Sequence, residues 1–146
     1  MAEAPAPEPS SRPRAAATVA DVMQPPLTTV EPNDHVAAAA YLLKHAGASA
    51  LVVLDDEQTR RPVGLITEAD IVHLVADGKD PNEVRIHDLM TTRPVVITTT
   101  TSIRDAAETM TTGHFRHLPV VGDDATLIGM VDIGDVCRAL LDIPVG

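Results

Sequence analysis

Two short stretches of the chain place an aspartate three residues after another oxygen-bearing side chain, directly behind a run of apolar residues. In the first stretch a Gly-Leu-Ile run leads to Thr67, and Asp70 follows. In the second, Asp132 stands at the position that corresponds to Thr67, and Asp135 stands at the position that corresponds to Asp70. This spacing is typical of a capping box, in which the two side chains bind backbone N–H groups at a helix start. Each stretch therefore predicts a strand that runs directly into a helix, and the spacing alone requires no ligand.

Other residue types that could carry chemistry do not form a catalytic pattern. No Ser or Cys has a neighbouring base, and no G-x-x-x-x-G-K-[ST] loop is present to hold a triphosphate. His35, His73 and His87 lack the paired spacing of metal ligands, and a zinc site from His114, His117 and an acidic residue is the weaker alternative. We therefore predict no enzyme, no metal site and no bound cofactor.

The composition disfavours two classes of partner. The chain has 146 residues, of which 45% are hydrophobic and 22% charged, and its net charge is −10. Nucleic-acid binding needs clustered Lys and Arg, which are absent here. No apolar run approaches the ~20 residues of a membrane span. Neither nucleic acid nor a membrane is expected as a partner.

Two further features bear on location and order. The single Cys137 excludes an internal disulfide framework and suits a reducing compartment, so a cytoplasmic protein is expected. Cys137 also falls on an apolar helical face, which predicts a core residue. Residues 1–17 are rich in Pro and Ala and are expected to form a disordered tail, because they cannot bury enough apolar area to offset their ordering entropy.

The remaining sequence is a tandem repeat. Ile86-His87-Asp88-Leu89-Met90 resembles Val19-Ala20-Asp21-Val22-Met23, an offset of 67 residues. The elements after each copy recur in the same order: short strands at 27–30 and 94–97, helices at 36–45 and 103–112, strands at 50–54 and 118–121, and strands at 63–66 and 127–131, each of the last followed by a helix. The predicted fold class is α/β (α+β), with repeats at 18–80 and 81–146, each built as short strand, helix, strand, strand, helix.

Capping residues place the ends of the repeated helices. Asn33 or Asp34 is expected to cap the helix at 36–45, and Gly47 to close it, with Gly113 in the closing role in the second repeat. A unit of about sixty residues buries only about 60% of its unfolded surface and is marginal alone. The two repeats should therefore pack about a pseudo-twofold axis and share a core.

The duplicated set resembles a pair of cystathionine-β-synthase (CBS) domains, also called a Bateman module. The resemblance rests on the order of elements, the Asp-φ-Met turn before each unit (φ apolar), the Leu118-Pro119-Val120 strand and the Gly-φ-φ-Thr-x-x-Asp-φ junction. It covers about Thr18 to Asp142. It implies two clefts between the repeats that bind adenosyl compounds, with the junction side chains at the ribose.

The resemblance assigns every part of a nucleotide to the cleft at the first junction. Its implied contacts come from both repeats: Thr67 and Asp70 at the ribose, Val95 and Val96 at the base, and His114, Arg116 and His117 at the phosphate. Carboxylate hydrogen bonds to ribose hydroxyls are charge-assisted, and Arg suits bidentate phosphate contact.

The cleft at the second junction is expected to be weaker. Its implied base platform, Thr28 and Thr29, is more polar than a valine pair, and Ser49 and Ala50 stand where the first cleft has Arg116 and His117. At the junction Asp135 is present, but Asp132 replaces the expected Thr or Ser. Asp132 would repel a phosphate and cannot donate a hydrogen bond, while Lys44 and His45 lie a turn away. We therefore expect one good nucleotide site per chain.

Two functions remain open from the sequence. The first is a regulatory module that senses AMP, ADP, ATP or S-adenosylmethionine and changes its shape or assembly. The alternative is a dimerisation or protein-interaction module whose clefts have lost their ligand. The family resemblance also implies a homodimer, and the regulated protein is expected to be a separate, unknown chain.

Overall fold

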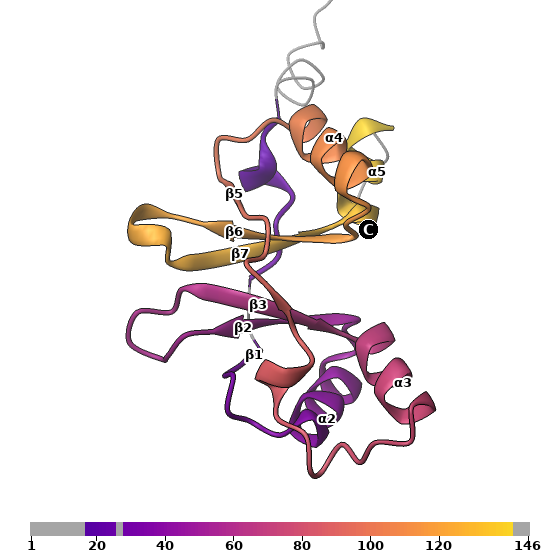
Figure 1. The fold of residues 1–146 in the computed structure, drawn as a ribbon. Helices are drawn as coiled ribbons and strands as arrows, with labels where there is room; N and C mark the ends of the chain where they lie inside the picture. Colours follow the sequence, from indigo (N-terminus) through magenta and orange to yellow (C-terminus); the bar gives the residue numbers. More distant parts are fainter. Residues whose placement is uncertain (1–16, 26–27, 142–146) are drawn as a thin grey trace, which may run out of the picture.

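The computed structural model describes residues 17–25 and 28–141 (Figure 1). The predicted tail at 1–17 falls almost entirely outside the described residues. The first repeat contains the elements η1 (Val19–Asp21), β1 (Thr29–Val30), α2 (Val36–Ala46), β2 (Ala50–Leu54), β3 (Pro62–Thr67) and α3 (Glu68–Ala76). The second contains η2 (Ile86–Asp88), β4 (Thr91–Thr92), β5 (Ile97–Thr98), α4 (Ile103–Gly113), β6 (His117–Val121), η3 (Asp123–Ala125), β7 (Leu127–Asp132) and α5 (Ile133–Leu140). The order of repeated elements is the predicted one.

The strands form two small mixed sheets. One has the order β1-β2-β3-β4 and the other β5-β6-β7, with the first strand of each parallel to its neighbour and the remaining pairs antiparallel. Figure 1 shows the sheets facing each other in the centre, with α2 and α3 beside one and α4 and α5 beside the other. The predicted α+β fold of two tandem repeats is confirmed. In the part of the chain described here, no helix has the length and apolarity needed to cross a membrane.

The opening turn of each repeat packs into the core of the other repeat. Val19 of η1 is fully buried in the core of the second repeat, beside Ile97 and Leu118. Ile86 of η2 is fully buried in the core of the first repeat, beside Val36. This exchange ties the two repeats together by hydrophobic burial, which is the dominant favourable contribution to folding.

The glycine of each junction motif makes room for the methionine of the exchanged turn. A Cβ on Gly64 would lie 2.5 Å from Sδ of Met90 and 2.8 Å from the carbonyl oxygen of Thr91. A Cβ on Gly129 would lie 2.7 Å from Sδ of Met23. The two repeated motifs, Asp-φ-Met and Gly-φ-φ, are therefore parts of one packing arrangement.

A third apolar cluster fills the space between the sheets. Val52 and Leu54 of β2 pack with Leu127 of β7, and Leu65 and Met130 lie against them. The backbone adds a link at the hairpin ends, where the Leu127 N–H donates to the carbonyl oxygen of Arg60 at 2.9 Å. The repeats thus share a core, as the small size of each predicts.

Three local predictions were wrong. The N-cap of α2 is His35, because the Asp34 carboxylate accepts from the Glu31 N–H at 2.9 Å and is turned away from the helix. The short strand expected at 94–97 lies at Ile97–Thr98. Cys137 is exposed, since α5 turns Asp135 and Val136 inward instead.

The end of α4 also differs from the prediction. Gly113 is the last helical residue, and His114 takes the left-handed closing conformation at φ 60°. A Cβ on Gly113 would overlap the Phe115 ring, so a larger residue here would have to displace that ring. In the first repeat Gly47 closes α2 with φ 63°, as predicted.

Candidate functional site

The first junction forms the predicted capping box. The Thr67 hydroxyl accepts from the Asp70 N–H at 3.2 Å, and the Asp70 carboxylate accepts from the Thr67 N–H at 2.9 Å. The next N–H of α3, on Glu68, donates to the carbonyl oxygen of Ser49 at 3.0 Å. β3 and α3 are therefore held in a fixed relation, and Thr67 lines a cleft.

That cleft is a cavity of about 560 Å³ between the two repeats. Its lining includes five of the seven residues predicted for the first nucleotide site: Thr67, Val95, His114, Arg116 and His117. The other two, Asp70 and Val96, are not part of the lining. Asp70 is engaged in the capping box, while Val96 is 39% exposed.

Sequence reasoning missed two lining residues that matter chemically. Arg93 lies in the same wall as Val95, with a left-handed φ of 50°, and adds a second guanidinium to that of Arg116. Phe115 adds an aromatic ring to the lining. Their places in the sequence could have indicated both residues. Arg93 lies just before the predicted base platform, and Phe115 lies between two residues predicted to bind the phosphate.

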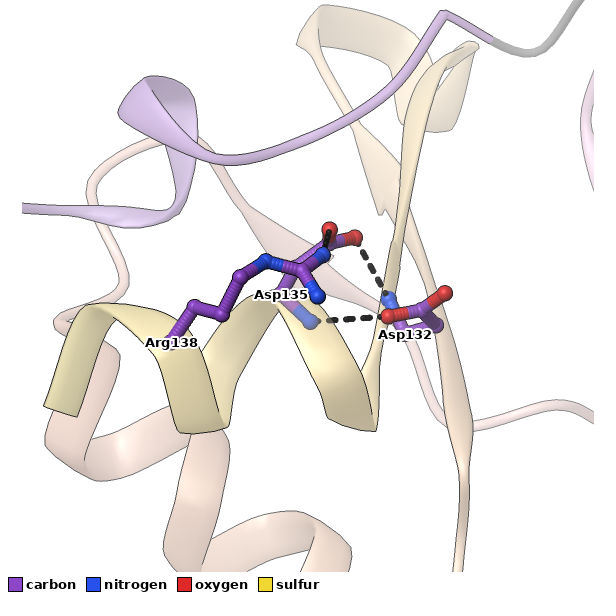
Figure 2. Close-up of polar contacts among 3 residues, drawn as sticks. All are labelled: Asp132, Asp135 and Arg138. Carbon is purple, nitrogen blue, oxygen red and sulfur yellow. Dashed lines mark hydrogen bonds and ion pairs between the residues drawn. The ribbon is translucent and has the colours of Figure 1, made fainter. Parts of the chain in front are cut away.

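The second junction carries a denser set of contacts (Figure 2). The Asp135 N–H donates to the Asp132 carboxylate at 2.8 Å, and the Asp132 N–H donates to Oδ2 of Asp135 at 3.2 Å. Arg138 adds an ion pair, from Nη2 to Oδ1 of Asp135 at 2.9 Å. Both carboxylate oxygens of Asp135 thus have protein partners. Sequence reasoning missed Arg138, although its i+3 spacing from Asp135 is a known signal for such a pair.

Burial changes the acidity of this junction. Asp135 is only 7% exposed, and its desolvation raises the pKa of the carboxyl group. The hydrogen bond from the Asp132 backbone N–H and the charge of Arg138 act in the opposite direction, whereas the charge of Asp132 adds to the rise. Burial of the ionised Asp135 carboxylate is therefore unfavourable, and the Asp132 backbone N–H and Arg138 offset part of that penalty.

The second cleft is the larger of the two, with a volume of about 860 Å³. Of the residues predicted for it, the lining includes Thr28, Ser49, Ala50, Asp132 and Asp135, but not Thr29. Lys44 also lines it, whereas His45 does not. Both clefts fall within the size range of small-molecule sites, roughly 300–1,000 Å³. Their ranking as binding sites rests on the chemistry of the walls and stays a prediction.

Three residues form a wall common to both clefts: Ser49, Glu68 and His117. The Ser49 hydroxyl and Nε2 of His117 are 2.8 Å apart, so a hydrogen bond joins the two repeats at this wall. Burial lowers the pKa of His117, and Arg116 lowers it further, while Asp132 opposes both. His117 is therefore a weaker source of positive charge near neutral pH than an exposed histidine.

Acidic and histidine side chains do not gather elsewhere. Across residues 17–25 and 28–141, no three or more His, Cys, Asp or Glu side chains come close enough to hold a metal ion. The Asp55 and Asp56 carboxylates instead organise the loop between β2 and β3, where they accept hydrogen bonds from Thr59 and Arg61. These two carboxylates therefore stabilise the loop itself.

Comparison with known proteins identifies the family. The CBS domain model matches the chain twice, at residues 19–77 and 86–142. A curated relative, the "Uncharacterized 17.7 kDa protein in bps2 3'region" of Acidianus ambivalens, is 36% identical over 128 residues, which is 88% of this chain and 76% of that protein. The chain spans only 54 to 64% of the length of three other curated relatives.

Solved structures share the fold. The structure of CBSX2 of Arabidopsis thaliana in complex with AMP aligns with a TM-score of 0.73 and 35% identity, covering 87% of this chain and 98% of that one. The CBS domain pair of protein MJ0100, in complex with 5′-methylthioadenosine and S-adenosyl-L-methionine, aligns with a TM-score of 0.76 and 25% identity, covering 85% and 99%. With the family's domain present twice and the fold of a CBS pair, the chain belongs to the CBS-domain family.

Proposed function

We propose that this chain is a regulatory module that binds a phosphorylated adenosyl nucleotide in the cleft at the first junction. One observation carries the proposal: a single cavity gathers Thr67 from one repeat with Val95 and Arg116 from the other. The AMP bound by the related protein CBSX2 supports an adenosyl ligand.

The chemistry of the cavity walls fits the three parts of such a ligand. Arg93 and Arg116 offer two guanidinium groups, which bind phosphate oxygens by charge-assisted hydrogen bonds. Val95 and Phe115 offer apolar and aromatic surface for the base, and Val95 is 40% exposed and free to be covered. Thr67 stands where α3 begins, and a helix N-terminus favours negative charge.

The proposed role of Asp70 at the ribose needs a second function for its carboxylate. Its Oδ2 atom accepts from the Thr67 N–H, which leaves lone pairs on the group for a ribose hydroxyl. Asp70 would therefore both fix the helix start and contact the sugar. A substitution here disturbs the cap as well, so Asp70 is a less clean probe of binding than Arg116.

A ligand in this cleft would contact both repeats, which is the basis for sensing. Thr67 belongs to the first repeat and Arg116 to the second, so relative movement of the repeats changes the number of contacts. A ligand shifts a conformational equilibrium only through such a difference between states. We propose that the occupied cleft fixes one arrangement of the repeats, which another protein recognises.

A thermal-shift panel tests the proposal. AMP, ADP and ATP are each expected to raise the stability of the chain, by ~2.7 kcal/mol at a free concentration 100 times Kd, because binding to the folded state alone shifts the equilibrium. Guanosine and uridine monophosphates are the controls for base selectivity. A flat response to all adenine compounds would contradict nucleotide sensing and would favour the interaction-module alternative.

Exposed apolar side chains on the helices support a homodimer. Val72 and Val75 on α3 are 62% and 57% exposed, and Leu140 on α5 is 52% exposed. Figure 1 shows α3 and α5 on the same side of the molecule. We propose that a second copy covers this side, since such apolar area is otherwise left in water.

Replacing Val72 with glutamate is expected to convert the dimer to a monomer, because the carboxylate would be buried without a partner in the interface. Light scattering coupled to size exclusion reports the mass. Ile128→Glu is the matched control, since Ile128 is an exposed apolar residue at the start of β7, far from α5 along the strand. A wild-type chain that runs as a monomer, or a Val72→Glu variant that stays dimeric, would contradict this interface.

A further inference from the structure

One side-chain hydrogen bond joins the two repeats at the wall that both clefts share. Ser49 stands just before β2 in the first repeat, and His117 is the first residue of β6 in the second. The Ser49 hydroxyl oxygen lies 2.8 Å from Nε2 of His117, and both residues line both cavities. A ligand in the first cleft would therefore contact the wall at which the repeats are joined.

The charges around His117 come from several elements. Asp132 is its register partner on β7, and Arg116 precedes it in the chain. The other ionisable side chains that line the two cavities with it are Arg93, His114 and Glu68 in the first cleft and Lys44, Glu68 and Asp135 in the second. Burial lowers the pKa of the His117 ring, Asp132 opposes this shift and Arg116 adds to it. The ring is therefore mainly neutral at pH 7 in the free chain.

A phosphate in the first cleft would reverse this balance. Its negative charge would lie beside a wall that includes His117, and a nearby opposite charge favours the protonated imidazole. In the protonated ring both nitrogens are donors, so Nε2 then donates to the Ser49 hydroxyl oxygen. A hydrogen bond from a charged donor is roughly twice as strong as a neutral one. Protonation of the ring would thus strengthen the link between the repeats.

We propose that His117 takes up a proton when a phosphate enters the first cleft, and that its hydrogen bond to Ser49 transmits this change to the contact between the repeats. The inference rests on the proposed function, because it requires a nucleotide phosphate in that cleft. It assigns His117 the role of a positioning residue whose state depends on both ligand and pH. Because the bound chain holds more protons than the free chain, AMP binds more tightly as the pH falls towards 6.5.

Calorimetry of the full chain with AMP between about pH 6.5 and 8 tests this directly. Titrations in pairs of buffers with different heats of ionisation count the protons exchanged. The wild type should take up a proton, in full or in part, for each AMP bound, and its Kd should fall by at most about 10-fold per pH unit on acidification. The phosphate of AMP titrates at about pH 6 and loses its proton on binding as the dianion, so its own contribution has the opposite sign.

Two variants separate the proton from the hydrogen bond. His117→Gln keeps an amide that can bond to Ser49 but does not titrate, so both the proton uptake and the gain in affinity at lower pH should disappear. Ser49→Ala keeps the ring and should keep the uptake, but AMP binding should weaken about 5-fold, the gain expected when one neutral bond becomes charge-assisted. His73→Gln is the matched control, since His73 is an exposed residue of α3 that lines neither cleft, and it should behave as the wild type does.

The outcomes distinguish this inference from the proposed function. If AMP binds without proton uptake, or if His117→Gln retains the uptake, the inference is wrong and the proposed function stands. A Ser49→Ala variant that binds AMP as tightly as the wild type would also overturn the inference, because the bond between the repeats would then have no part in binding. If no adenine nucleotide binds at any pH, both are wrong.

Discussion

Replacing Arg116 with glutamine is expected to weaken AMP binding about 10- to 150-fold. The variant loses the guanidinium that faces the first cavity, and hydrogen bonds to charged groups contribute about 1.5–3 kcal/mol each. The fold should be unaffected, because Arg116 is exposed and its contact with α5 is through the backbone, where its carbonyl oxygen accepts from the Ile133 N–H at 2.9 Å. Isothermal titration calorimetry measures the change in Kd.

The control for Arg116 removes the same charge elsewhere. Arg104 on α4 has a side chain that is 82% exposed, pairs with Glu108 on the surface and lies outside both clefts. Arg104→Gln should bind AMP as tightly as the wild type does. Because both variants remove one positive charge from a chain of net charge −10, this control separates a local effect of Arg116 from an effect of net charge. If Arg116→Gln and Arg104→Gln bind AMP equally well, the phosphate does not lie in the first cleft.

Replacing Ile86 with alanine is expected to lower the free energy of unfolding by about 2–5 kcal/mol. Ile86 is fully buried in the core of the first repeat, although it stands at the start of the second. Truncation leaves a cavity among the side chains of α2 and β2, and packed cores collapse only partly around such a cavity. Urea denaturation gives the change in stability.

Hydrogen exchange shows which repeat is affected. Because Ile86 packs with Val36 and Leu74, α2 and α3 should lose protection before α4 and α5 do. The exposed Ile128 provides the control, and Ile128→Ala should change stability by no more than about 0.5 kcal/mol. Protection lost first in α4 and α5 would mean that the opening turns are not exchanged between the repeats.

The sequence predicted the elements set by local patterns. The strand at Ala50–Leu54 is a continuous apolar run, and the capping box of Thr67 and Asp70 follows from residue type and spacing alone. Comparison of the two repeats then fixed the order of elements, since each copy supports the interpretation of the other. These features depend on contacts between residues close in the chain, which sequence patterns report well.

Features that depend on distant contacts could not be predicted in this way. The repeated turns at Val19 and Ile86 could be recognised in the sequence, but not the core that each one enters, because both cores are aliphatic. The close approach of the Phe115 ring to Gly113 and the left-handed conformation of His114 between them are set by packing and not by residue type. The same holds for the first cleft, where the place of Arg93 in the wall follows from the path of the chain after β4.

A crystal structure of the chain grown with AMP tests the central claim most directly. We expect one AMP per chain, in the cleft at the first junction, with the phosphate at Arg116 and Arg93 and the base against Val95. The second cleft, with Asp132 in its wall, should hold no AMP. AMP bound in the second cleft alone, or equally in both, would contradict the assignment of the nucleotide site to the first junction.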